Sequence, residues 1–287
     1  MGPANPIHAS RFSAGKPARV MGELTNLAMS RFVNLEFGDE SESHGQEAGA
    51  NELKGEAHFL AGARSAFENG RFESALRHFS KVLEFNPRNT TAWAGQVRML
   101  IELREFSEAK LWADKALEQF PRDPELLATK AVALGRAGDL QGAIAFSDAS
   151  IAERGDTAYV WLARADVLLA RREARADYCF AKAQLLAPKD WFVTWLAARI
   201  RFYHRQFAVS LKLLQQALEW NTAHFLLWLE LGRSQLALGL AGPATISFQR
   251  ARELNPQSDE VRAALLEAAR TGAGSRLRGW LHQIFKR

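Results

Sequence analysis

Hydrophobic residues recur at helical spacing along most of this chain, in paired segments separated by short turns. Residues 228–256 show the pattern most clearly. Trp228 and Leu231 fall on one face of a first helix, and Ala244 and Phe248 fall on one face of a second, because residues three or four positions apart share a helix face. A proline ends the second segment, since proline cannot continue a helix. The pattern predicts two amphipathic helices joined by a tight turn.

This two-helix unit repeats along the chain. A small residue marks the second helix of each unit, at Ala75, Ala109, Ala143, Ala176, Ser210 and Ala244. The intervals between these marks are 34, 34, 33, 34 and 34 residues. The units end at Pro87, Pro121, Gly155, Pro188, Thr222 and Pro256. Six units are therefore predicted, and the fourth lacks one residue around 171–176, in the turn between its helices or the helix end beside it.

The unit at residues 228–256 resembles a tetratricopeptide repeat. It has W-x2-LG from Trp228, then A-x3-F-x2-A from Ala244 and a closing Pro256, with Gln235 where that family has Tyr. The family's period is also about 34 residues. The resemblance implies an all-α, right-handed superhelical solenoid of about six helix-turn-helix repeats over residues 53–257. It also implies that the first helices line a concave face, where ligands of such arrays usually bind.

The N-terminal 1–52 segment is predicted to be mostly disordered, because it is rich in Pro and Gly with little periodicity. Within it, residues 23–37 have the pattern of a short amphipathic helix, and residues 38–52 form an acidic, Ser/Gly-rich linker. Residues 35–43 combine apolar and acidic side chains. We hypothesise that they occupy the concave groove in cis, so that deleting residues 1–50 tightens binding of an acidic peptide.

The C-terminal segment predicts two further helices. Residues 258–272 begin with Ser258 as an N-cap and would cover the last apolar face of the solenoid. The glycines at 272 and 274 are expected to end this helix. Residues 273–287 then form a basic amphipathic tail, composed of Arg276, Arg278, Trp280, Leu281, Ile284, Phe285, Lys286 and Arg287 among others. Such a tail could contact an anionic membrane or a partner, or fold back as an extra cap.

Charge and composition narrow the classes of function. The formal net charge is +5, but much of the excess lies in the C-terminal tail, so no nucleic-acid partner is expected. There is no secretory signal and no run of about 18 apolar residues. The single cysteine, Cys179, is consistent with a reducing compartment. We therefore expect a cytoplasmic protein that could be peripheral to a membrane.

No catalytic constellation is recognisable in the sequence. Phosphate-binding glycine loops, zinc-protease motifs and nucleophile elbows are missing from it. The seven histidines are scattered without metal-ligand spacing. The sequence therefore predicts a non-catalytic protein with no metal and no cofactor.

The inward position of the first helices forms a ladder of arginines in four of the six repeats. These arginines are Arg64, Arg98, Arg199 and Arg233, with Val132 and Asp166 in the other two repeats. Neighbouring like charges would repel without a ligand, and guanidinium groups bind carboxylates bidentately, so an acidic ligand is expected. The alternative is that Glu102 and Glu230, on nearby inner turns, already pair with the arginines.

Repeats four and five add apolar inner residues, including Tyr159, Leu162, Trp195 and Phe202. Trp195 and Phe202 lie off the packing marks of their repeat, so they are predicted to form an aromatic pocket in the groove. The alternative is that the fifth repeat is rotated and buries Trp195 in the core. The predicted function is a protein-interaction scaffold or adaptor that binds an acidic, partly apolar segment in the groove. A membrane-associated assembly or recruitment factor anchored by the tail is the second prediction.

Overall fold

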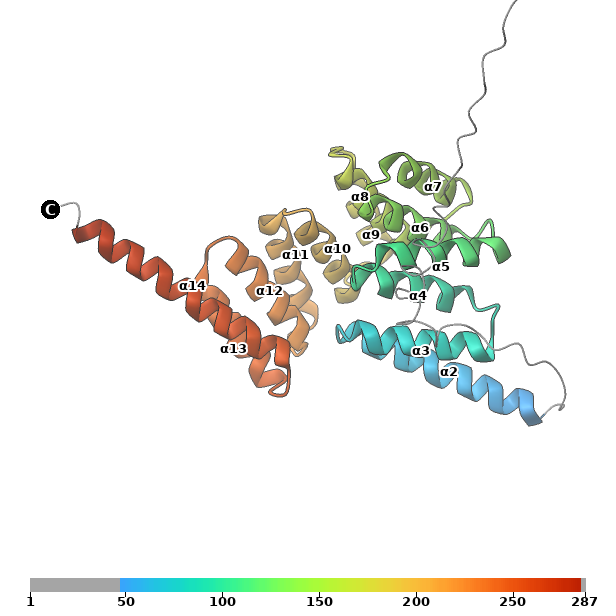
Figure 1. Cartoon of the computed structure of the whole chain (residues 1–287), viewed down its shortest axis with the longest axis horizontal. Coiled ribbons are helices and arrows are strands. Elements are labelled where there is room, and N and C mark those ends of the chain that lie inside the picture. Colours follow the sequence, from blue (N-terminus) through green and yellow to red (C-terminus); the bar gives the residue numbers. More distant parts are fainter. Residues whose placement is uncertain (1–46, 285–287) are drawn as a thin grey trace, which may run out of the picture. The chain divides into compact units, whose positions relative to one another are not determined.

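The computed structural model describes residues 47–284, with side chains described over residues 55–271. Every regular element in this range is an α-helix (Figure 1). The helices are α2 (Glu47–Glu68), α3 (Phe72–Phe85), α4 (Thr90–Glu102), α5 (Phe106–Gln119), α6 (Pro124–Arg136), α7 (Leu140–Ala152), α8 (Ala158–Ala170), α9 (Ala176–Leu186), α10 (Trp191–Tyr203), α11 (Phe207–Trp220), α12 (Phe225–Ala237), α13 (Ala241–Leu254) and α14 (Asp259–Ile284). Consecutive helices pack in pairs from α2–α3 to α12–α13, and α14 packs on the last pair. This is the all-α repeat solenoid that the resemblance implies.

A residue in the left-handed conformation ends the first helix of every pair. These residues are Gly70, Arg104, Gly138, Arg172, Arg205 and Gly239. The turn is closed by a backbone bond, for example from the Arg71 amide to the Ala66 carbonyl at 2.9 Å, as in other helix C-caps of this kind. The conformation costs a non-glycine residue about 1 kcal/mol. Packing of the helix pairs therefore outweighs local preference at the three arginines.

The missing residue of the fourth repeat shortens α9 at its N-terminus. In the other pairs the second helix begins two residues after the left-handed residue, as Phe106 does after Arg104. In contrast, α9 begins at Ala176, four residues after Arg172. The amides of Ala176 and Asp177 bond to carbonyls three residues earlier, so a tight turn replaces the first helical turn. The deletion lies where the spacing predicts.

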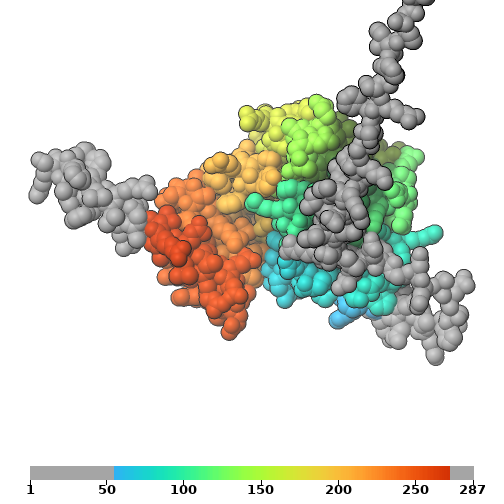
Figure 2. Space-filling view, in the orientation of Figure 1, coloured from blue at the N-terminus to red at the C-terminus, as the bar shows by residue number. Residues whose placement is uncertain are grey.

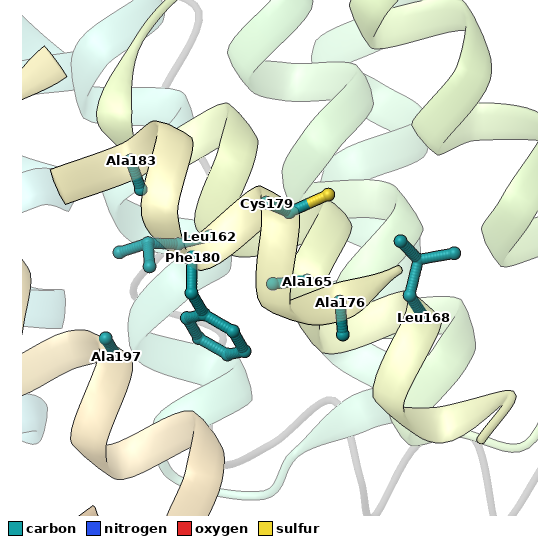
Figure 3. Packing of buried hydrophobic residues seen from close by; sticks show 8 residues of the cluster. All are labelled: Leu162, Ala165, Leu168, Ala176, Cys179, Phe180, Ala183 and Ala197. Carbon is teal, nitrogen blue, oxygen red and sulfur yellow. The ribbon is translucent and has the colours of Figure 1, made fainter. Parts of the chain in front are cut away.

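Small residues at the contacts let the helices approach closely. A Cβ atom on Gly232 would lie 2.4 Å from the ring of Phe248, and one on Gly95 would lie 2.4 Å from Phe79. One local core, between α8, α9 and α10, is drawn in Figure 3 and consists of Leu162, Ala165, Leu168, Ala176, Cys179, Phe180, Ala183 and Ala197. The family-like residues of the sequence are thus packing residues.

Two predicted boundaries are wrong. Helix α2 begins at Glu47, so residues 47–52 are helical and do not belong to the linker. Helix α14 continues through Gly272 and Gly274 to Ile284, because glycine inside a helix costs only about 1 kcal/mol relative to alanine. The predicted 23–37 helix and the hypothesis on residues 35–43 lie outside the described residues. Within residues 47–284, none of the helices has the length and apolar character needed to cross a membrane.

The first helices curve so strongly that the first repeat touches the fifth and sixth. Phe67 of α2 packs edge-on against Phe192 of α10, with ring centroids 5.1 Å apart. A Cβ atom on Gly70 would lie 3.2 Å from a methyl group of Leu226 in α12. A straight stack would separate α2 from α12 by five steps of about 8–10 Å. The concave face is therefore largely covered by side chains of this chain.

Candidate functional site

The four arginines of the predicted ladder are each paired with a carboxylate of this chain. The pairs are Arg64 with Glu68, Arg98 with Glu125, Arg199 with Glu102 and Glu230, and Arg233 with Glu230 and Glu260. The expectation that these arginines repel one another without a ligand is therefore wrong. The alternative, pairing with Glu102 and Glu230, holds for Arg199 and Arg233. Arg64 lies apart from the others, on an exposed side of α2.

Arg199 connects several first helices across the concave face. Its Nη1 donates to Glu230 at 2.7 Å, and its Nη2 donates to Glu102, which lies 97 residues away in the sequence. The guanidinium carbon lies 4.9 Å from the Phe72 ring centroid and 5.1 Å from that of Trp195. Burial alone would lower the pKa of Arg199, but Glu102 and Glu230 more than offset it and raise that pKa. Arg199 therefore joins α4, α10 and α12 (Figure 2 shows the second and fifth repeats in contact).

A second buried layer joins α6, α8 and the end of α10. Arg136 donates to Asp166 through Nη2 at 2.7 Å and through Nε, and its guanidinium carbon lies 3.3 Å from the centroid of the Tyr203 ring. His204 Nε2 lies 2.7 Å from the other oxygen of Asp166. Burial by itself would raise the pKa of Asp166, but Arg136 and His204 lower it on balance. The Asp166 carboxylate is thus held ionised in the interior.

A third contact fixes Arg98. Its Nη2 donates to Glu125 at 2.6 Å, and its guanidinium carbon lies 3.2 Å from the centroid of the Tyr159 ring. Burial raises the pKa of Tyr159 to about 12, although the charge of Arg98 opposes this. The Arg98 Nε is buried without a partner. Tyr159 and Arg98 therefore pack on each other, and both remain partly exposed, with the Arg98 side chain 20% exposed.

Trp195 is not part of an open aromatic pocket. Its side chain is fully buried, with its ring 5.2 Å from Phe192 and 6.1 Å from Phe67. The prediction that it faces the groove is wrong, because the curvature brings α2 over this position. Leu162 is also core, at 1% exposure. Phe202 lines an open cavity, and its ring packs on Phe207 at 5.1 Å. Tyr159 and Leu162 line a smaller cavity of about 40 Å³.

The open part of the concave face is a cavity of about 260 Å³, which we call the groove mouth. Its lining residues are Ile101, Glu102, Arg104, Arg136, Arg199, Ile200, Phe202, Tyr203, Glu230 and Arg233. Its lining holds four arginines and two glutamates. Two further carboxylates outside the lining, Asp166 and Glu260, pair with Arg136 and Arg233. Arg104 is exposed and has no acidic partner among the described residues. The groove mouth therefore offers positive charge beside two aromatic rings.

Other chemistry is sparse in the described part of the chain. Residues 55–271 hold no group of three His, Cys, Asp or Glu side chains placed to bind a metal. Cys179 is buried, and burial raises the pKa of its thiol, so the reactive thiolate is disfavoured at neutral pH. The side chains of the predicted tail residues 276–287 lie outside the described range. The charged and aromatic side chains of the concave face are arranged so that they can bind a ligand.

Several residues of the groove mouth were missed by the sequence prediction. Arg136 and Tyr203 stand four residues after the ladder positions 132 and 199, which places them one helical turn further along the same face. Glu102 has the same relation to Arg98 and was already named from the sequence as a partner of the arginines. Extending the ladder by one turn would have found Arg136 and Tyr203. Arg104 gives no such signal, because it lies in a turn.

The fold and this site define a class of protein, an α-helical repeat protein with a curved binding face. Tetratricopeptide repeat family models match residues 66–133 and 196–259. The chain therefore contains tetratricopeptide repeats. Repeat proteins of this architecture bind partners on extended concave surfaces. The general function is therefore that of a protein-interaction scaffold.

Several solved structures are similar to this chain. The APC/C hetero-tetramer Cut9–Hcn1 is 15% identical with a TM-score of 0.45, over 73% of this chain and 48% of that chain. TTC0263, a thermophilic repeat protein of Thermus thermophilus, is 17% identical with a TM-score of 0.46, over 75% and 98%. The first repeat domain of Spaghetti (RPAP3), bound to an HSP90 peptide, is 20% identical with a TM-score of 0.36, over 41% and 94%.

These similarities concern the arrangement of helices and extend no partner to this chain. The chain spans about half of the length of the Cut9–Hcn1 chain that it matches. Among curated proteins, none matches this sequence significantly.

Proposed function

We propose that this chain is a non-catalytic adaptor that binds an acidic, partly apolar segment of a partner protein at the groove mouth. The observation that carries the proposal is the composition of that cavity. Exposed Arg104 has no acidic partner among the described residues, and it lines the cavity together with Arg233 and the rings of Phe202 and Tyr203. Positive charge next to apolar surface suits a segment in which carboxylates flank an apolar anchor.

The accessible arginines differ in what a partner has to displace. Arg104 has no acidic partner among the described residues and makes the first contact without breaking an ion pair. Arg233 is 35% exposed and holds the exposed carboxylate of Glu260 at 3.0 Å. An exposed ion pair contributes only about 0–1 kcal/mol. A partner carboxylate can therefore replace Glu260 at little cost.

The residues deeper in the concave face stabilise its shape and do not contact the partner segment. Arg98 lies on Tyr159, and Trp195 is fully buried. A partner segment that reached Trp195 would have to separate α2 from α10. The proposed contact is therefore shorter than the full concave face and is limited to the groove mouth.

The test is a binding titration with a defined probe. A fluorescein-labelled peptide with the sequence of residues 35–43 carries two large apolar side chains and four acidic ones. Fluorescence anisotropy compares the wild-type chain with the Arg104→Glu/Arg233→Glu variant. Arg77→Glu/Lys212→Glu is the matched control, since it makes the same change in charge at exposed positions of the second helices α3 and α11.

We expect saturable binding that weakens with salt, because exposed ion pairs are screened as ionic strength rises. The groove-mouth variant should bind about tenfold or more weakly, a change of roughly 1.4 kcal/mol. The control variant should bind like the wild type. Equal losses in the two variants, or equal binding of a peptide with all four acids changed to amides, would contradict the proposal.

A second candidate function is a membrane-associated assembly factor that uses the C-terminal tail as an anchor. The continuity of α14 to Ile284 favours it, because it places residues 276–284 on one helix. Co-sedimentation with anionic vesicles of the full chain, and of the chain ending at residue 274, tests it. Equal partitioning of the two proteins would remove this candidate.

A further inference from the structure

The outer face of α9 is apolar where a solvent-facing helix is normally polar. Tyr178 and Leu185, two turns apart, are 65% and 72% exposed, and Ala181 lies between them on the same face. The opposite face of α9 carries Cys179 and Phe180, which are buried in the core shown in Figure 3. The exposed apolar residues are therefore additional to those that the fold uses.

Comparison of the repeats shows that the fold does not require these residues. The position of Leu185 holds Glu84, Glu118, Glu219 and Glu253 in four other repeats. In two of them the glutamate accepts a bond from a basic residue three positions earlier, at 2.7 Å in both Lys81–Glu84 and Arg250–Glu253. Repeat four keeps the basic residue, Lys182, but has leucine in place of the acid. The change removes a charge pair and exposes apolar surface.

The neighbouring side chains form a small surface with these residues. The Tyr178 ring meets Trp161 of α8 edge-on, with centroids 6.0 Å apart. The Lys182 ammonium lies 5.9 Å from the centroid of the same Trp161 ring. We name Trp161, Tyr178, Ala181, Lys182 and Leu185 the α9 face. It combines an apolar stripe with a positive charge that has no acidic partner among the described residues.

The charge decides which partner fits. In an antiparallel pair of two α9 helices, Tyr178 of one copy would oppose Leu185 of the other. The midpoint would then fall between Ala181 and Lys182, so the two Lys182 ammonium groups would meet at the crossing and repel. A helix that carries acidic side chains beside its apolar stripe would instead supply the carboxylate that this repeat lacks. Tyr178, Ala181 and Leu185 have the i, i+3 and i+7 spacing with which an amphipathic helix contacts its partner.

We propose that the α9 face docks an amphipathic helix of a partner protein, with acidic residues flanking its apolar stripe. This site lies on second helix α9 and shares no residue with the groove mouth. Arg104→Glu/Arg233→Glu should therefore leave it unaffected, which separates failure of this proposal from failure of the proposed groove function.

The chain offers a variant that restores the pattern of the other repeats. Leu185→Glu places an acid three residues after Lys182, as Glu84 stands after Lys81, so the fold should be kept. Ile246→Glu is the matched control, because Ile246 is a 67% exposed apolar residue on another second helix, α13. Urea midpoints of both variants should equal or exceed that of the wild type.

The probe is a synthetic helical peptide with leucines at i, i+4 and i+7 and glutamates along both flanks, labelled with fluorescein. We expect saturable anisotropy changes with the full-length wild type and with Ile246→Glu. Binding should be about tenfold or more weaker with Leu185→Glu, and similarly weaker when lysines replace the glutamates of the peptide.

Three outcomes would overturn the proposal. The first is no saturable binding up to about 1 mM, which is weaker than about −4 kcal/mol. The second is an equal loss of binding in Ile246→Glu. The third is a dimer in analytical ultracentrifugation that Leu185→Glu dissociates, because a second copy of this chain would then be the occupant of the α9 face.

Discussion

Replacing Asp166 tests whether the concave face is closed to water. Its side chain is 5% exposed and that of its partner Arg136 is 11% exposed. Asp166→Leu would leave Arg136 buried without a carboxylate and would also take the acceptor from His204. Breaking a buried pair in this way costs about 3–5 kcal/mol, whereas an exposed pair contributes about 0–1 kcal/mol. We therefore expect a loss of several kcal/mol in the free energy of unfolding.

The double variant Arg136→Met/Asp166→Leu provides the internal control. Replacing both charges of a buried pair with apolar residues is often neutral or stabilising. Most of the loss in Asp166→Leu should therefore be recovered. Asp148→Leu is the exposed counterpart, since Asp148 is 60% exposed in its pair with Arg164, and it should cost less than about 1 kcal/mol.

Urea unfolding followed by circular dichroism measures all of these proteins under one condition. The expected order of stability places wild type, Asp148→Leu and the double variant close together, with Asp166→Leu well below them. If Asp166→Leu costs no more than Asp148→Leu, the layer around Asp166 is in contact with water and the closed concave face is refuted.

Two further predictions concern packing and pH. Gly232→Val should destabilise the chain by at least about 2 kcal/mol, because a Cβ atom there would lie 2.4 Å from the Phe248 ring. Gly242→Ala should instead stabilise α13 by up to about 1 kcal/mol, because no atom lies near the added Cβ. Thermal melts of the two variants check the opposite signs. The raised pKa of Tyr159, about 12, stabilises the fold below the ordinary tyrosine value near 10, and this contribution is lost as pH rises from about 10 toward 12. Absorbance at 295 nm should show one late tyrosine, absent in Tyr159→Phe; co-ionisation of all tyrosines near pH 10 would contradict it.

The repeat architecture could be predicted because it depends on local pattern. Helix faces and turn residues are visible within one unit, and the 34-residue interval is visible between neighbouring units. Even the deletion beside Ala176 was therefore found from spacing. The ends were predicted less well. Residues 47–52 have no apolar pattern, yet they extend α2. Gly272 and Gly274 resemble a stop, although helix propensity is a weak guide to where a helix ends.

The groove could not be predicted in the same way. Whether Trp195 faces a ligand or a core depends on curvature, which is the sum of small rotations between successive repeats. No single repeat contains that information. The ion pair between Glu102 and Arg199 joins residues 97 positions apart. It forms only because the curvature of the solenoid brings α4 and α10 together. The arginines lie on the first helices as predicted, but Glu125, Glu102 and Glu260, the partners of Arg98, Arg199 and Arg233, come from other helices.

The most direct test of the closed concave face is a distance between the first and last repeats in solution. Arg71 and Gln257 are exposed and line one cleft of about 510 Å³. Spin labels at Arg71→Cys and Gln257→Cys, in a Cys179→Ser background, report this distance by double electron–electron resonance. The account predicts a single distribution well below about 40 Å, the least that a straight stack of five steps of 8–10 Å would give. A distribution centred at or beyond that value would contradict closure.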